Sequence, residues 1–123
     1  MPEYQKLVRD GIPRIIKEAG ETPIIRILNP GAEFIGALVT KVTEETAELD
    51  AAETREDRTG EAADLKELKR ALDEEGIEDE SLNELLASLE VELGAQEIEV
   101  ARQKKFDERG GFDERIFLER TEP

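Results

Sequence analysis

The fold of this chain is decided by residues 34–52, FIGALVTKVTEETAELDAA. On a helical wheel at about 100° per residue, the apolar residues of this stretch form a single stripe. The stripe consists of Phe34, Leu38, Val42 and Leu49. Glu45 falls inside the stripe, whereas Glu48 and Lys41 fall at its edge. The pattern predicts a long helix from about Ala32 to Ala52 that carries carboxylates on the face turned toward the core.

A second stretch, residues 61–72 (EAADLKELKRAL), repeats this arrangement. Its apolar stripe consists of Leu65, Leu68 and Leu72. Glu61 lies inside the stripe and Asp64 lies at its rim. We expect a helix from about Glu61 to Glu75, closed by the glycine that follows, and we interpret the polar residues Thr54 to Gly60 as a loop.

These two acidic pairs have i,i+3 spacing, and each faces a core. Burying an unpaired carboxylate costs several kcal/mol or forces it to take up a proton. Four carboxylates in one place would repel one another unless a cation lay among them, and a cluster of oxygen ligands suits Mg²⁺ or Mn²⁺. The alternative is chance, because the chain has 32 Asp and Glu among 123 residues and most acidic pairs are solvated. We assign a solvated role to Glu67, Glu74, Glu75, Glu84, Glu90 and Glu92.

Two short segments far apart in the chain have the composition of strands. Ile24 to Leu28 is rich in β-branched residues and ends at a turn signal, and Arg115 to Glu119 is a second such run. We expect these segments to pair, and we expect Arg120 to Pro123 to be frayed. Ahead of them, Pro13 at a first turn and Gly20 as a stop predict a short helix.

A third long helix is predicted from Ser81, which can form a capping box with Glu84. Its apolar stripe consists of Leu82, Leu85, Leu86, Leu89 and Leu93. After Gly94 the apolar phase shifts to Ile98 and Ala101, which indicates a kink, a break or a second packing partner.

Composition limits the possible classes. The length predicts one domain over residues 1–123, and 4% aromatic content favours a core of aliphatic side chains on packed helices. The absence of Cys and His excludes disulfides, thiolate nucleophiles, zinc ribbons and His-containing triads. A net charge of −15 argues against nucleic acid or an anionic membrane as partner. The charged N-terminal residues and the lack of an apolar run of about 20 residues predict a cytoplasmic protein.

The order of several motifs resembles one family. Residues 44–48 (EETAE) and, twelve residues later, 61–64 (EAAD) are similar to the EExxE…ExxD signature of the MazG-like all-α nucleoside triphosphate pyrophosphohydrolases. Residues 7–13 (LVRDGIP) resemble the LVRDKIP-type opening of the phosphoribosyl-ATP pyrophosphohydrolase-like branch. A basic pair at 104–105 and the ERGGF of 108–112 resemble the close of that branch. The resemblance covers nearly the whole chain.

The resemblance implies an all-α fold, an antiparallel helical bundle with short strand-like segments near both ends. It also implies Mg²⁺, or Mn²⁺, held by Glu45, Glu48, Glu61 and Asp64, the same four residues that the helical wheel singles out. Glu44 lies off the stripe and would orient water as a base or support the ligands, and Glu45 would share in catalysis. The implied reaction converts a nucleoside triphosphate to the monophosphate and pyrophosphate.

Cationic side chains should complete a phosphate site. The candidates are Arg9, Lys41, Lys104, Lys105 and Arg109. For Lys41 the alternative is a helix ion pair with Glu45, and for Arg9 it is an ion pair with Asp10. For the two adjacent lysines it is compensation of a helix C-terminus, and the Gly-Gly pair beside Arg109 is compatible with a simple turn.

Two features depart from the family pattern. Gly11 stands where this branch usually carries Lys, so a phosphate contact made there would be lost or replaced. The segment between Asp64 and Lys104 also looks longer than usual, which affects how the third helix packs. Thr54 to Arg58, between the two ligand helices, is a place where a base could be read, but nothing in it specifies the base or the sugar.

The apolar surfaces predict an oligomer, a homodimer or homotetramer. Ile35 and Val39 widen the apolar face of the first long helix, and the leucines of 82–93 add a third surface that one small chain is poorly placed to bury. Two other readings stay open. One is a non-catalytic helical partner protein that retains an acidic metal-binding cluster, and the other is an acidic structural protein resembling a coiled coil.

Overall fold

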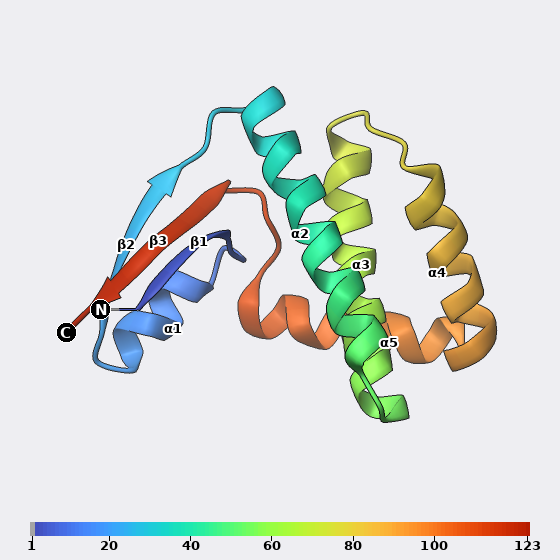
Figure 1. The fold of residues 1–123 in the computed structure, drawn as a ribbon. Helices are drawn as coiled ribbons and strands as arrows, with labels where there is room; N and C mark the ends of the chain where they lie inside the picture. Colours follow the sequence, from blue (N-terminus) through green and yellow to red (C-terminus); the bar gives the residue numbers. More distant parts are fainter. Residues whose placement is uncertain (1) are drawn as a thin grey trace.

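The computed structural model describes residues 2–123 of the chain, which form five helices and three strands over that range (Figure 1). In chain order the elements are β1 (Glu3–Leu7), α1 (Ile12–Glu18), β2 (Thr22–Ile27), α2 (Ala32–Ala51), α3 (Arg55–Glu74), α4 (Glu80–Leu93), α5 (Ala95–Arg109) and β3 (Ile116–Glu122). The predicted all-α bundle is therefore wrong, because the helices share the molecule with an antiparallel sheet.

The sheet lies at one side of the molecule with α1 beside it (Figure 1). Its strand order is β1-β3-β2, and β3 pairs antiparallel with both neighbours. The predicted pairing of the two strand-like segments is confirmed, since Ile25 lies opposite Leu118 and Arg26 opposite Phe117. The predicted fraying of the tail is wrong, because residues 116–122 form the central strand and Arg120 is opposite both Glu3 and Ile24.

The strand β1 was not predicted because its sequence, EYQKL, lacks alternation of apolar and polar residues. It is an edge strand whose first three residues are exposed, so its stability comes from backbone pairing with β3. Behind the sheet, a small second core contains Val8, Ile116 and Leu118, against which Ile12 and Ile16 of α1 pack. This core gives α1 and the sheet a common apolar interior.

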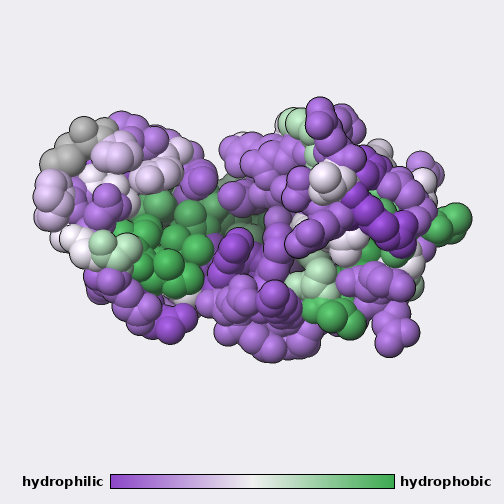
Figure 2. All heavy atoms as spheres, turned by 90° about the horizontal axis from the view of Figure 1, so that it is seen from below, coloured by the Kyte–Doolittle hydropathy of each residue, from purple (hydrophilic) through white to green (hydrophobic). Residues whose placement is uncertain are grey.

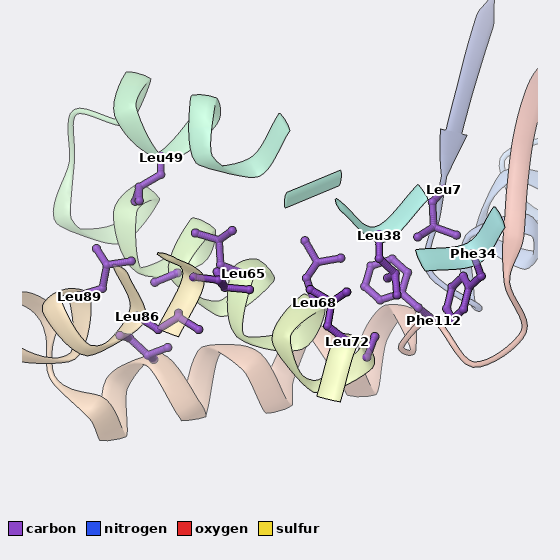
Figure 3. Close-up of a cluster of buried hydrophobic side chains, with 14 of the residues drawn as sticks. Leu7, Phe34, Leu38, Leu49, Leu65, Leu68, Leu72, Leu86, Leu89 and Phe112 are labelled. Atoms are coloured by element: carbon purple, nitrogen blue, oxygen red, sulfur yellow. The ribbon is translucent and has the colours of Figure 1, made fainter. Parts of the chain in front are cut away.

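The main core lies among the four longer helices (Figure 3). The helix α2 runs alongside α3, and both α4 and α5 pack against α3 (Figure 1). The predicted leucine stripes are confirmed as core by the burial of these residues: Phe34, Leu38, Leu49, Leu65, Leu68, Leu72, Leu82, Leu86, Leu89 and Leu93. In the described residues 2–123, no helix is long and apolar enough to cross a membrane.

The segment Thr54 to Gly60 was predicted to be a loop, and this prediction is wrong: the segment forms the cap and first turns of α3. Thr54 Oγ1 accepts a hydrogen bond from the amide of Asp57 (3.0 Å), which satisfies a free donor at the helix start. Arg58 donates to the carbonyl of Leu49 (3.3 Å) and pairs with Glu92 (2.6 Å). These tertiary contacts extend the helix through residues that carry no apolar periodicity.

Two further predictions are corrected by polar contacts. The cap of α4 is Asp79, whose Oδ1 accepts from the amide of Leu82 (3.0 Å), so the helix begins before Ser81. Glu67 is not solvated: it is only 3% exposed and accepts a hydrogen bond from Arg102 Nη1 at 2.8 Å. Arg102 comes from α5, which crosses α3 at this point, and sequence spacing gives no sign of that crossing. Of the three interpretations of the phase shift at Gly94, a break is what the structure shows, because α4 ends there and α5 begins.

Candidate metal centre

Three of the four singled-out carboxylates meet between α2 and α3. Glu45 comes from α2, while Glu61 and Asp64 lie one turn apart on the facing side of α3. Each offers a carboxylate oxygen, and these three oxygens all lie within 4.8 Å of one another. Glu45 is 7% exposed, and the other two are partly buried. The phase of each residue against its leucine stripe places it here.

The electrostatics of this cluster are unfavourable for three full negative charges. Burial is the main cause that raises the pKa of Glu45 to about 9, and the adjacent carboxyls of Glu61, Asp64 and Glu48 raise it further. Burial also raises the pKa of Glu61, with Glu48 and Asp64 adding to the effect. The Oε2 atoms of Glu45 and Glu61 are buried without a hydrogen-bond partner in the described residues. Unpaired buried oxygens of this kind call for a proton or a cation.

The remaining two acidic candidates lie outside the close triad. Glu48 is exposed, and it borders the cluster closely enough for its charge to raise the pKa of both Glu45 and Glu61. Glu44 is exposed on the neighbouring face of α2, with its carboxylate 4.0 Å from Lys41 Nζ. Glu48 therefore stands at the rim of the site, and Glu44 stands further out.

Asp64 is held by two cations, one at each oxygen. Arg9 Nη2 donates to Oδ1 at 2.8 Å, and Lys105 Nζ donates to Oδ2 at 3.0 Å. Lys105 also donates to the carbonyl of Gly60 at 3.0 Å, so it is fixed against α3. Lys41 Nζ lies 3.9 Å from Glu45 Oε1, which is the helix ion pair considered above. Three of the five predicted cations thus contact the carboxylates themselves.

The other two predicted cations, Lys104 and Arg109, are exposed and line a cavity of about 1,000 Å³ beside the cluster. Glu48 and Glu61 line the same cavity, so the carboxylates and the free cations face a common space. Lys105 lines it as well. Its wall also includes many charged side chains of α3 and α5, together with several alanines.

The two end motifs are joined directly. Arg9 donates to the carbonyl of Gly110 (2.9 Å), and the amide of Asp10 donates to the carbonyl of Gly111 (2.8 Å). The Asp10 carboxylate then accepts from two successive amides, those of residues 113 and 114, at 3.0 Å each. Arg9 therefore does not pair with Asp10, as considered above, but spans from this clamp to Asp64 on α3.

Gly11 is explained by this clamp. Its amide donates to the carbonyl of Arg109 at 2.8 Å, and a Cβ atom added to Gly11 would lie 2.8 Å from that same oxygen. Such a contact is closer than a side chain tolerates without backbone movement. The backbone approach here requires glycine, a constraint that the sequence alone did not reveal.

A second, smaller cavity was not predicted. It has a volume of about 380 Å³, and Arg9, Lys41, Glu45 and Asp64 form part of its wall. The Arg9 guanidinium carbon lies over the ring of Phe112, 5.6 Å from the centre of that ring. Phe112 lines the cavity as well. Its other lining residues come from β1 and the segment after it, α1, α3, α5 and β3.

Comparison with known proteins gives little further information. No family model and no solved structure matches the chain. An uncharacterized protein of Mycolicibacterium smegmatis (strain ATCC 700084 / mc(2)155) is 51% identical over 51 residues, which is 42% of this chain. The match spans about half of that relative, 51% of its length.

Proposed function

We propose that this protein is a Mg²⁺-dependent hydrolase that cleaves a nucleoside triphosphate, or a related nucleotide, to the monophosphate and pyrophosphate. The observation that carries the proposal is the close cluster of Glu45, Glu61 and Asp64, in which two buried oxygens have no hydrogen-bond partner within residues 2–123. The resemblance of residues 44–48 and 61–64 to the MazG-like signature supports the choice of reaction.

The donor set fits a hard divalent cation. Glu45, Glu61 and Asp64 offer only oxygen atoms, and Glu48 stands beside them at the rim. Mg²⁺ and Mn²⁺ prefer such ligands. Burial makes it costly for Glu45 to ionise alone, so a cation bound at its free oxygen would offset the free-energy cost of the buried charge. When bound, Mg²⁺ neutralises phosphate oxygens and activates water for attack on phosphorus.

The protein's own cations have separable roles in this proposal. Lys104 and Arg109, which are exposed in the larger cavity, would bind the phosphates. Arg9 and Lys105 fix the orientation of Asp64. Glu44, by resemblance alone, would orient the attacking water. That water forms the new bond to the α-phosphorus and releases a proton to the solvent, the bond between the α-phosphorus and its bridging oxygen breaks, and pyrophosphate leaves.

A screen of nucleoside triphosphates with separate detection of pyrophosphate and orthophosphate tests this proposal. We expect pyrophosphate with Mg²⁺ or Mn²⁺, no turnover in EDTA, and loss of turnover in Glu45→Gln and Asp64→Asn. Glu84→Gln, which removes a charge from an exposed position of α4, is the control that should retain activity. Orthophosphate as the sole inorganic product, or full activity in EDTA, would contradict the proposal.

The non-catalytic alternative keeps one specific observation in its favour. Both oxygens of Asp64 have cationic partners within the chain, Arg9 and Lys105. A protein that only binds a cation or a partner would need no more than this. It would gain thermal stability with Mg²⁺ and yet leave every nucleotide in the screen intact.

We also propose that the working form is a homodimer or homotetramer, in the cytoplasm. The predicted third apolar surface is covered within the chain, because the leucines of α4 are buried against the other helices. Val39 on α2 remains 47% exposed, and Val100 on α5 remains 62% exposed. Light scattering from low to high salt tests association, which should strengthen as salt screens the net charge of −15.

A further inference from the structure

The smaller cavity is lined largely by apolar side chains, whereas most of the face seen in Figure 2 is hydrophilic. Figure 2 shows apolar side chains gathered in a hollow between the part of the molecule that contains the sheet and the helical part. The apolar lining comes from α1, the sheet, the segments that adjoin them and α3, and includes Val8, Ile12, Ile15, Ile16, Phe112 and Leu118. Its volume, about 380 Å³, lies within the range of about 300–1,000 Å³ typical of small-ligand pockets.

One wall of this cavity belongs to the metal centre. Glu45 and Asp64 line it, and so do Arg9, Lys41 and Arg109. Arg109 lines the larger polar cavity too, so the two cavities adjoin across the carboxylate cluster. A ligand that fits this arrangement has an apolar part for the small cavity and an anionic part that reaches the cations and carboxylates at its edge.

We propose that the small cavity holds the base and sugar of a nucleotide while its phosphates lie over the carboxylates toward Lys104 and Arg109. This inference rests on the proposed function and specifies where the nucleoside binds. The larger cavity offers the phosphates four cationic side chains, Arg55, Lys104, Lys105 and Arg109. Six acidic side chains also line it, so phosphates would bind there together with Mg²⁺. The small cavity suits the base because apolar and aromatic side chains form most of its wall, with only a few charged groups at its edge.

The inference gives the sheet a role in binding. Tyr4 on β1, Leu118 on β3 and Ile15 on α1 all line the cavity. Tyr4 is the sole tyrosine of the chain, and there is no tryptophan. Both facts make the cavity accessible to spectroscopy without interference from other sites.

The first test uses the unaltered protein with a labelled Tyr4 ring, observed by NMR. The probes are the α,β-methylene analogues of ATP, GTP, CTP and UTP with Mg²⁺, because they resist cleavage at the proposed bond. Inorganic tripolyphosphate with Mg²⁺ is the matched probe that lacks a nucleoside. We expect the ring signals to shift with at least one analogue and to stay in place with tripolyphosphate. An equal shift with both probes would overturn the inference.

The second test places a single tryptophan at the cavity. Ile15 is 37% exposed, so Ile15→Trp adds a fluorophore at the wall with little disturbance of the core. Val91→Trp is the control, because Val91 on α4 is 90% exposed and does not line the cavity. We expect the analogues to quench Trp fluorescence in the Ile15 variant and to bind at least about tenfold more tightly than tripolyphosphate. The Val91 variant should show no quenching.

The outcomes separate this inference from the proposed function. Nucleotide-dependent signals at positions 4 and 15 without pyrophosphate release would support the binding site and count against the hydrolase. Pyrophosphate release with no signal at either position would overturn the binding site and leave the hydrolase intact. Absence of both signals and of turnover would reject both proposals.

Discussion

Replacing Glu45 with Gln should stabilise the metal-free protein, in a way that depends on pH. The pKa of Glu45 is raised from 4.5 to about 9, so at pH values between these limits the folded state holds a proton that the unfolded state has released. The folded state then binds more protons, and the free energy of unfolding of the natural protein falls as pH rises through this window. Glutamine is neutral in both states and removes that loss.

The size of the effect follows from the shift. Each pKa unit corresponds to about 1.36 kcal/mol, so at a pH of about 7.5, three units above the unfolded value, the upper bound is about 4 kcal/mol. The neighbouring carboxyls titrate together with Glu45, which reduces the expected gain to about 2 kcal/mol. For a chain of this length that corresponds to a Tm rise of roughly 6–12 °C. Below a pH of about 4.5 the difference should vanish, because Glu45 is protonated in both states.

Calorimetry of both proteins in EDTA, from a pH of about 4 to about 8, measures this difference. Glu84→Gln removes the same charge from an exposed site and should show no gain that grows with pH. Added Mg²⁺ should raise the Tm of the natural protein and not that of the Glu45 variant. A Glu45→Gln protein that is less stable than the natural one at neutral pH, or a difference that does not change with pH, would refute the reasoning.

Three further perturbations test individual contacts. Lys105→Met should lower the unfolding free energy by about 1.5–3 kcal/mol, because it removes the charge-assisted hydrogen bond to Asp64, and it should tighten Mg²⁺ binding in calorimetric titration. Lys104→Met removes the same charge without a contact to Asp64. Equal effects of the two substitutions would contradict the assignment of Lys105 as the partner of Asp64. Gly11→Ala should lower the free energy of unfolding, measured in urea, by about 1–3 kcal/mol, because the added Cβ meets the backbone at the end of α5. An unchanged urea midpoint would show that the two backbone segments can move apart without cost. Arg102→Leu should cost about 2–4 kcal/mol, because it leaves the buried Glu67 with only the more distant Arg70, 4.0 Å away. A double variant with Glu67→Leu should recover stability, and no recovery would locate the loss elsewhere.

The sequence predicted the helical half of the fold well. In α2 and α3 the apolar residues have one clear phase, and the same phase identified Glu45 as a buried acid without any structural information. Glu48 shows the limit of this approach, because a residue at the edge of a stripe can turn to solvent or to the site with little change in angle. Its exposure depends on how closely α3 approaches α2, which a wheel of one helix does not contain.

The remaining part of the fold depends on contacts between distant residues. The strand β1 has no apolar pattern, and it exists because β3 offers it a row of backbone partners. Glu67 looked like many other surface glutamates, and only the crossing of α5 supplies its Arg102 partner. Resemblance alone drew attention to the two end motifs. Their physical role is the mutual clamp of residues 9–11 and 109–111, and the sequence does not show that these distant segments meet.

The sheet order has a consequence for biosynthesis. Strand β3 lies between β1 and β2 in the sheet, yet in the sequence it comes long after both strands. Gln5 and Glu119, for example, are hydrogen-bonded but are separated by 114 positions in the chain. At about 5–20 residues per second, a ribosome that has made β2 needs roughly 5–20 seconds more to deliver β3. Until then both nascent strands lack their shared neighbour, and the clamp that holds Arg9 against Asp64 cannot close. A chain that stalls or is cut before residue 116 would lose the centre of the sheet, so the site cannot assemble until residues 116–122 have been made.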